Sequence, residues 1–219
     1  MERTNFNNKL FGRTRGRSSK KISLKQYFKI IQEYKIKEFK ENSHYILDIG
    51  TGYGETSIYL SKKNKEKSII SCEKYIDGNL NLVKQIKQEN ITNIKIHPGN
   101  VHEILNKLGD KRYFDSIWLF FPDPWPKKKH HKRRLITFNF LEKIHNYLKP
   151  KGKIYIVSDL PSYTKQILNS IYQANDLYDW VNQNQAYLGF KDYFDLETKF
   201  YNKAIIEGRQ PILLILKKI

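Results

Sequence analysis

The chain has 219 residues, of which 39% are hydrophobic and 14% aromatic, so it is long and apolar enough to bury a core and is not a disordered protein. Its 40 lysine and arginine residues outnumber the 22 acidic ones, and the formal net charge of +18 predicts that polyanions are drawn to its surface. No apolar run has the length that spans a bilayer, and we expect neither a secretory signal nor a membrane partner. The single cysteine, Cys72, excludes an internal disulfide, so we expect a cytoplasmic protein.

The N-terminal residues differ in composition from the rest of the chain. Residues 3–29 carry many lysine and arginine side chains and no acidic one, and their middle is rich in glycine, arginine and serine. This composition predicts a flexible basic arm over residues 1–23. We expect residues 24–219 to form one domain.

Apolar runs alternate with stretches of helical periodicity along that domain. Such alternation is typical of an α/β protein whose sheet carries helices on both faces. The predicted strands span residues 45–49, 68–72, 93–97, 114–121, 153–158 and 211–216. The predicted helices span residues 55–63, 79–89, 101–108, 135–148, 162–174 and 198–207; residues 24–39 begin helical structure, residues 149–152 end the helix before them, and residues 175–197 fit neither pattern.

A glycine-rich turn follows the first predicted strand. Asp48 closes that strand, and Gly50, Gly52 and Gly54 follow it at every second position. The dinucleotide fingerprint has the different spacing G-x-G-x-x-G, and its pyrophosphate prefers bare amides. A carboxylate at the strand end instead suits a cofactor with an amino-acid moiety, because it can pair with an ammonium group. Ligands of open α/β sheets bind outside the carboxyl ends of the strands, where this turn is expected.

Polar side chains also end the next two predicted strands. Glu73 follows the second strand and can accept hydrogen bonds from both hydroxyls of a ribose. Asn100 follows the third strand, and its amide offers the donor and acceptor that an adenine edge needs. The alternative is a simple glycine turn with ordinary polar strand ends. The order of the acid, the glycines, Glu73 and Asn100 favours a cofactor site.

The fourth predicted strand leads into the loop Pro122-Asp123-Pro124-Trp125-Pro126. Prolines stiffen this loop around the Asp123 carboxylate, and the indole of Trp125 can stack against a base. The eight residues from Lys127 to Arg134 include six basic side chains and two histidines. Such a run is often only a solvated surface, but its place beside the expected active site suits a grip on phosphates.

A metal site made of Asp123, His130 and His131 is another interpretation of this segment. The neighbouring cations oppose metal binding, and the spacing matches no standard zinc pattern. We therefore expect no metal.

These segments resemble the bacterial tRNA (guanine-N7-)-methyltransferases, from about Phe11 to the C-terminus. The most specific match is the run from Phe120 to Lys127 with the His-Lys-Arg-Arg residues after it; Asp48 to Gly52, Ser158-Asp159 and Thr198-Lys199-Phe200 match as well. The resemblance implies a Rossmann-like class I methyltransferase fold, with a mostly parallel seven-stranded sheet and an antiparallel last strand. It also implies S-adenosylmethionine as methyl donor and a guanine in the variable loop of tRNA as substrate.

The resemblance assigns roles to individual positions of this chain. Those expected to bind the cofactor include the three glycines of the turn and are Asp48, Gly50, Gly52, Gly54, Glu73, Asn100 and Asp123. Those expected to bind the tRNA substrate are Lys127, Asp159 and residues 198–201, among them Thr198 and Tyr201. Those expected to lie on the RNA are Lys129, His130, His131, Lys132, Arg133 and Arg134. The chain departs from the family at Asn100, where an Asp is usual, and at Tyr201, where the family has an acid.

Guanine N7 carries a lone pair and no proton, so methyl transfer to it requires no general base. We assign catalysis to Asp123, which can favour the positive charge that develops on the purine or hold the guanine N1–H and amino group. Asp159 shares that task or caps the helix that follows it.

Other functions fit parts of the sequence. A non-catalytic RNA-binding protein on a methyltransferase fold would need the basic residues but not the glycine turn. A methyltransferase for another RNA base is a second alternative, but adenine-N6 enzymes carry a further proline after the acidic or amide residue of this loop. We infer no obligate protein partner, and a monomer and a homodimer both stay open.

Overall fold

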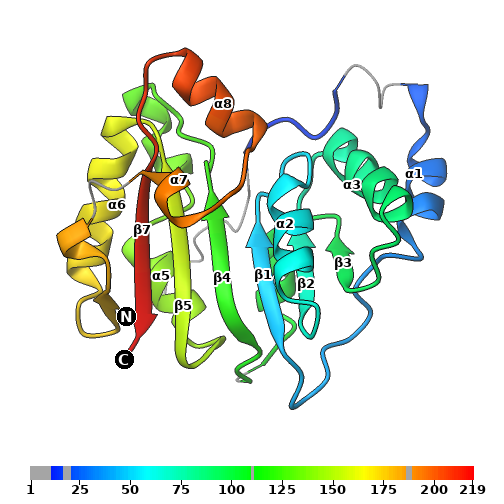
Figure 1. The fold of residues 1–219 in the computed structure, drawn as a ribbon, viewed down its shortest axis with the longest axis horizontal. Helices are drawn as coiled ribbons and strands as arrows, with labels where there is room; N and C mark the ends of the chain where they lie inside the picture. The colour runs from blue at the N-terminus through cyan, green and yellow to red at the C-terminus, as the bar shows by residue number, and fades with distance from the viewer. Residues whose placement is uncertain (1–10, 17–20, 110, 186–188) are drawn as a thin grey trace.

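The short apolar runs of the sequence form the strands of one seven-stranded sheet in the computed structural model, which describes residues 11–16, 21–109, 111–185 and 189–219 (Figure 1). The spatial order is β3-β2-β1-β4-β5-β7-β6. Only β7 runs antiparallel to its neighbours, β5 and β6. The strands are β1 (Tyr45–Ile49), β2 (Ser68–Cys72), β3 (Ile94–His97), β4 (Phe114–Phe120), β5 (Leu148–Ser158), β6 (Tyr178–Trp180) and β7 (Ile212–Lys218). The predicted mostly parallel sheet with an antiparallel last strand is confirmed.

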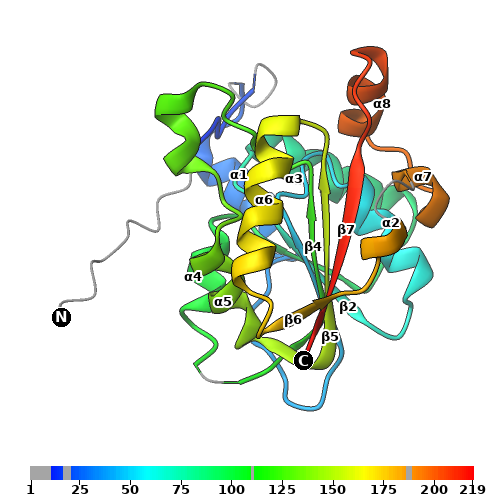
Figure 2. The same ribbon diagram turned by 90° about the vertical axis from the view of Figure 1, so that its left-hand side faces the viewer.

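Helices cover both faces of this sheet (Figure 2). One face packs against α4 (Val101–Leu105), α5 (Phe138–His145) and α6 (Pro161–Gln173). The other packs against α1 (Leu24–Ile31), α2 (Glu55–Lys63), α3 (Ile76–Gln88) and α7 (Phe190–Tyr193). None of the helices in the described parts of the chain is long and apolar enough to cross a membrane.

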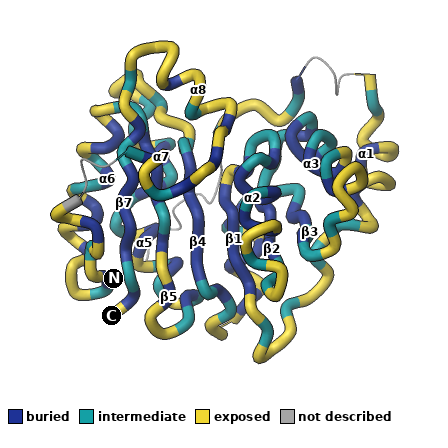
Figure 3. The backbone as a smooth tube through the Cα atoms, in the orientation of Figure 1, coloured by how far each residue is buried: buried dark blue, intermediate teal, exposed yellow. Residues whose placement is uncertain are grey.

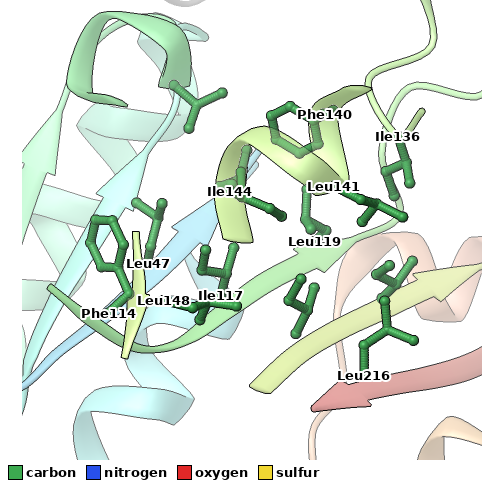
Figure 4. Packing of buried hydrophobic residues seen from close by; sticks show 14 of the residues in the cluster. Leu47, Phe114, Ile117, Leu119, Ile136, Phe140, Leu141, Ile144, Leu148 and Leu216 are labelled. Atoms are coloured by element: carbon green, nitrogen blue, oxygen red, sulfur yellow. The ribbon is translucent and has the colours of Figure 1, made fainter. Parts of the chain in front are cut away.

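The central strands are buried on both sides, which explains their continuous apolar sequence (Figure 3). Ile117 and Leu119 of β4 are fully buried and pack in one cluster with Leu141 and Ile144 of α5 (Figure 4). Full burial of such a side chain stabilises the fold by about 1.5–3 kcal/mol. This core fixes the strands whose carboxyl ends carry the polar residues.

The helix predicted over residues 135–148 is shorter, because α5 begins only after Thr137, whose Oγ1 caps the amide of Phe140 at 3.3 Å. Residues 149–152, predicted to end that helix, instead belong to β5. The register between β4 and β5 shifts there, and Lys151 has a positive φ of 61°, so the extra residues form an irregularity at the strand's start.

Two further segments complete the carboxyl edge of the sheet. The helix α8 (Lys199–Ile206) lies above the ends of β4 and β5 at the top of Figure 1. The 3₁₀ helix η2 (Lys128–Arg133) contains most of the predicted basic run. A further 3₁₀ helix, η3 (Gln183–Gln185), follows β6 in the chain.

Candidate functional site

A cavity of about 560 Å³ opens at the carboxyl edge of the parallel strands. Its wall combines the glycine turn after β1, the end of β2, the loop after β4, part of the N-terminal arm and one side of α8. This volume lies within the range of sites that enclose a small-molecule ligand or cofactor. The predicted position of the site, outside the carboxyl ends of the strands, matches the place of the cavity.

The glycine turn brings bare backbone to the cavity. Gly50 and Gly52 lie on the wall with φ angles of +74° and +61°, which side chains rarely adopt. A Cβ built on Gly50 would meet no atom within 4 Å, so the space above it is open to a ligand. Gly54 is different, because it begins α2 behind the wall, and a Cβ there would meet Leu82 at 2.8 Å.

Asp48 lies behind this turn and does not line the cavity, although the sequence predicted a direct cofactor contact. It is 1% exposed, and the Ser57 hydroxyl donates a 2.7 Å hydrogen bond to its Oδ2. Burial raises the pKa of Asp48 to about 7, and the Ser57 hydrogen bond opposes this rise. In this position Asp48 supports the turn through α2 rather than from within the cavity.

Glu73 stands on the cavity wall at the end of β2. The amide of Gly52 donates to its Oε2 at 2.9 Å, and the amide of Tyr75 donates to its Oε1 at 2.8 Å. Burial raises the pKa of Glu73, while hydrogen bonds from backbone amides lower it. A carboxylate has about four acceptor positions, so these amides leave it able to accept a hydrogen bond from a ribose hydroxyl.

Asn100 lies between two wall residues, Gly99 and Val101, but is not itself on the wall. Its Oδ1 accepts a hydrogen bond from the amide of His102 at 3.0 Å and so caps α4. The Oδ1 of Asn100 is thus engaged in the cap, and its contact with an adenine edge stays a prediction.

The loop after β4 brings Asp123 and Trp125 to the cavity wall as well. Phe121 and Trp125 have positive φ angles of 50° and 40°, an unfavourable conformation for large side chains. Although Asp123 keeps contact with solvent, the surrounding protein desolvates its carboxylate and raises its pKa, and the charge of Lys74 opposes this rise. Lys74 also lines the cavity, which the sequence did not indicate.

The basic run continues from this loop as η2. The side chains of Lys127, Lys129 and Lys132 are exposed, and His130 and His131 are partly so. The guanidinium of Arg133 lies over the Trp125 ring, 4.9 Å from its centroid, and lines the cavity. Arg133 thus brings one charge of the run to the cavity wall, and the contacts of the run with RNA stay a prediction.

Arg134 is the exception, and its predicted contact with RNA is wrong. Its side chain is 4% exposed, and it donates hydrogen bonds to protein oxygens on the loop after β4 and on α6. A guanidinium buried in this way has no face left for a phosphate.

Residues 11–16 of the N-terminal arm pack against the domain, in contrast to the flexible arm that the sequence predicted; residues 1–10 and 17–20 lie outside the described residues. The amide of Ile76 donates to the Thr14 carbonyl at 2.9 Å. Phe11 reaches the cavity, and the Arg133 guanidinium lies 4.7 Å from the centre of its ring (Figure 2, the dark blue segment beside the green one). Beyond its basic character, the sequence of the arm carries no signal for this docking.

Helix α8 reaches the cavity with part of the predicted segment, residues 198–201, and with one residue beyond it. Lys199, Phe200 and Lys203 line the wall. The predicted substrate contacts Thr198 and Tyr201 make protein contacts instead: Thr198 Oγ1 caps α8 through the Tyr201 amide at 3.0 Å, and the Tyr201 ring packs on Phe190 at 5.2 Å. Asp159, the third of these residues, accepts a 2.8 Å hydrogen bond from Arg209, and it does not cap α6, whose N-cap is Leu160.

The described residues contain no group of three or more His, Cys, Asp or Glu side chains arranged to hold a metal ion.

Comparison with known proteins identifies this arrangement. A family model described as "Putative methyltransferase" matches residues 42–214. A tRNA (guanine-N(7)-)-methyltransferase of Nitrosomonas europaea is 39% identical over 163 residues, which cover 74% of this chain and 71% of that protein. The chain belongs to the tRNA (guanine-N(7)-)-methyltransferase family. The family member of Cereibacter sphaeroides is 32% identical over 165 residues, which cover 75% of this chain and 66% of that protein. The chain thus spans about two thirds of the length of such relatives.

Solved structures agree on the fold. An rRNA methylase from Streptococcus thermophilus superposes with a TM-score of 0.53 at 13% identity, covering 87% of this chain and 93% of that one. At this identity the likeness concerns the fold alone. Tyr201, where the resemblance led us to expect an acid, packs on Phe190 of α7. The cavity wall carries the carboxylates of Glu73 and Asp123.

Proposed function

We propose that this protein transfers a methyl group from S-adenosylmethionine to N7 of a guanine in the variable loop of tRNA. The observation that carries the proposal is the meeting of Glu73, Asp123 and Trp125 at one cavity bordered by the basic run. Membership in the tRNA (guanine-N(7)-)-methyltransferase family supports both the reaction and the substrate. A tRNA substrate also supports a cytoplasmic location.

The residues present fit S-adenosylmethionine. Glu73 keeps acceptor positions for ribose hydroxyls, and the backbone of Gly50 and Gly52 leaves open space beside it. When bound, the cofactor supplies an electrophilic methyl group on a positively charged sulfonium. We assign Gly50, Gly52 and Glu73 to cofactor binding, with Asn100 near the adenine and Asp48 behind the turn.

Methyl transfer to guanine N7 requires the protein to align the two reactants and to stabilise the charge that develops. Guanine N7 attacks with its lone pair and has no proton to release, so no residue needs to act as a general base. Positive charge develops on the purine, and the Asp123 carboxylate on the cavity wall favours it. Burial raises the pKa of Asp123, and the charge of Lys74 opposes this rise and so favours the ionised form that this role requires.

Recognition of the RNA falls to the border of the cavity. Lys127, Lys129, His130, His131 and Lys132 are exposed or half-exposed along one segment and suit contacts with phosphates. The indole of Trp125 offers a stacking surface for a base. Thr198 and Asp159 have a supporting role, because they hold α8 and the turn after it, which bring Phe200 to the cavity.

The test is methylation of unmodified tRNA transcripts with radiolabelled S-adenosylmethionine, followed by identification of the labelled nucleoside. We expect label in 7-methylguanosine and its loss in a matched transcript whose variable-loop guanine is replaced by adenosine. Label in another nucleoside would keep the methyltransferase and remove the proposed target. Absence of both label and calorimetric cofactor binding would favour the RNA-binding alternative.

A further inference from the structure

Arg134 ends the basic run, yet its surroundings are those of an interior residue. Four of its five N–H donors have oxygen acceptors in the protein. Nε donates to the Pro124 carbonyl at 2.8 Å, and Nη2 donates to the Ser162 hydroxyl at 3.0 Å. Nη1 donates to the Ser162 carbonyl at 3.1 Å and to Gln166 Oε1 at 3.0 Å. The guanidinium also lies over the Tyr163 ring, 4.8 Å from its centroid.

The acceptor on the loop stands between the two residues that the proposed reaction uses. Pro124 separates Asp123 from Trp125, so a bond to its carbonyl fixes the peptide that joins them. Prolines at positions 122, 124 and 126 remove three amides from this loop, which leaves it few donors of its own. The hydrogen bond from Arg134 to the Pro124 carbonyl therefore fixes a loop whose own sequence supplies few backbone donors.

The same loop contains backbone conformations that its surroundings must maintain. Phe121 and Trp125 both have positive φ angles, at 50° and 40°. Such conformations persist in large residues only where neighbouring structure holds them. The Pro124–Arg134 bond attaches this strained loop to a helix.

The helix that anchors Arg134 is itself firmly attached. Tyr163 of α6 is fully buried, and its hydroxyl accepts a hydrogen bond from the Ile136 amide at 3.0 Å. Gln166 of α6 donates to the Ile136 carbonyl at 3.2 Å. Arg134 therefore connects a rigid part of the core to the loop at the cavity.

We propose that Arg134 is a positioning residue for methyl transfer, which fixes Asp123 and Trp125 at the cavity through the carbonyl of Pro124. It makes no contact with tRNA phosphates, unlike the exposed residues of the same run. This role rests on the proposed methyl transfer to guanine.

The first variant is Arg134→Lys, which keeps the charge but cannot bridge Pro124 to Ser162 and Gln166. At saturating cofactor and tRNA, we expect the single-turnover rate per cofactor-binding molecule to fall at least about tenfold, since misplacement of reacting groups carries losses of this order or more. Calorimetry gives the number of cofactor-binding molecules, so loss of folded protein does not count as loss of rate. An unchanged rate per binding molecule would overturn the proposal.

Salt dependence of tRNA binding separates positioning from phosphate contact. A lost phosphate contact lowers the slope of log affinity against log salt by about one. We expect Arg134→Lys and Arg134→Gln to leave the slope unchanged and the matched variant Lys132→Gln to lower it, because Lys132 is exposed. A slope that falls by about one in Arg134→Gln would contradict the proposal.

A milder variant and a spectroscopic readout cover the case in which Arg134 variants fold poorly or the proposed reaction is wrong. Ser162→Ala removes one anchor of Arg134, and we expect a rate loss of about twofold to fivefold, in line with the loss of one part-buried hydrogen bond. With 5-fluorotryptophan in the protein, Ser162→Ala and Arg134→Lys should shift the ¹⁹F resonance of Trp125 and leave those of Trp118 and Trp180 in place.

The two failures are then distinct. A wild-type protein that methylates no tRNA would refute the proposed function, and the Trp125 resonance would still decide whether Arg134 holds the loop. A Trp125 resonance that does not move in either variant would refute the positioning role, whatever the wild-type activity.

Discussion

The two sides of the cavity are held in different ways. On the side of β1 and β2, backbone groups hold the wall: the amides of Gly52 and Tyr75 donate hydrogen bonds to the Glu73 carboxylate. On the side of β4, the loop around Asp123 is held by Arg134 and faces Phe11, which comes from more than a hundred residues earlier in the chain. The first side is held by backbone amides, and the second by the long side chain of Arg134 and by contact with the N-terminal segment.

This difference matches the tasks of the two sides under the proposed function. A cofactor of constant shape suits a wall made of short backbone contacts, which are already in place before it binds. A guanine inside a folded tRNA needs aromatic and charged groups at fixed positions, and these come on long side chains. Substitutions on the two sides should therefore affect different measured quantities.

The largest effect is expected on the β4 side, from Asp123→Asn. Loss of the carboxylate removes its stabilisation of the developing positive charge, so kcat should fall by about 10²-fold, as for other preorganised electrostatic groups. Cofactor affinity should change far less, because Glu73 is untouched. Steady-state kinetics and calorimetry measure the two, with the exposed Asp176→Asn as control. A near-normal kcat would mean that Asp123 contributes no charge stabilisation.

On the β1 side, Gly78→Ala should break the cofactor wall. A Cβ on Gly78 would lie 2.0 Å from the carbonyl oxygen of Gly52. The clash is with backbone, so the glycine turn or the helix would have to shift to relieve it. Helix propensity favours Ala over Gly by about 1 kcal/mol, which is less than such a clash costs. We expect cofactor affinity to fall by about 10- to 100-fold in calorimetry, while Lys84→Ala on the same helix leaves it unchanged. Unaltered affinity would show that the turn tolerates displacement.

Stability should depend on pH through Asp48, which supports the same turn. Its pKa is about 7 in the folded state because burial disfavours the charge, and about 4 in the unfolded chain. Folded protein then binds more protons between these values, so this group lowers the free energy of unfolding as pH rises from 4 to 7. Relative to wild type, Asp48→Asn should gain about 2 kcal/mol between pH 5 and pH 8. Urea denaturation measures the free energy of unfolding at each pH. If it changed equally with pH in wild type and Asp48→Asn, the raised pKa assigned to Asp48 would be wrong.

The smallest effect should come from the arm, through Gly12→Ala. A Cβ at this position would lie 2.8 Å from Asp123 Oδ2, and the φ of +116° disfavours any side chain. Displacement of the arm would release Phe11 from Arg133, a contact worth about 0.5–1 kcal/mol at a partly exposed site. We expect cofactor dissociation about threefold faster in stopped-flow displacement. The control is Thr14→Ala, which keeps the hydrogen bond from the Ile76 amide to the carbonyl of residue 14. Equal cofactor dissociation rates in both variants would show that the arm does not help to retain the cofactor.

Most of the fold followed from the sequence, because apolar runs of strand length mark buried parallel strands wherever they occur. Glycine turns and strand-end acids were also visible, since the sheet places every parallel strand end at one edge. The prediction was weaker where contacts between distant segments override local pattern. The helix before β5 ended early, and residues 149–152 joined the strand.

Residue patterns were enough to predict the α/β architecture, the place of Glu73 and Asp123 at the sheet edge, and the basic segment that follows them. Tertiary structure alone decided that Arg134 is buried while its neighbours are exposed, that Asp48 stands behind the turn, and that residues 11–16 reach the cavity. The cause is the distance along the chain over which each effect acts, because strand periodicity and turn chemistry depend only on residues a few positions apart. Burial of a charged side chain depends on whether acceptors such as Pro124 and Ser162, from separate segments, surround it in space.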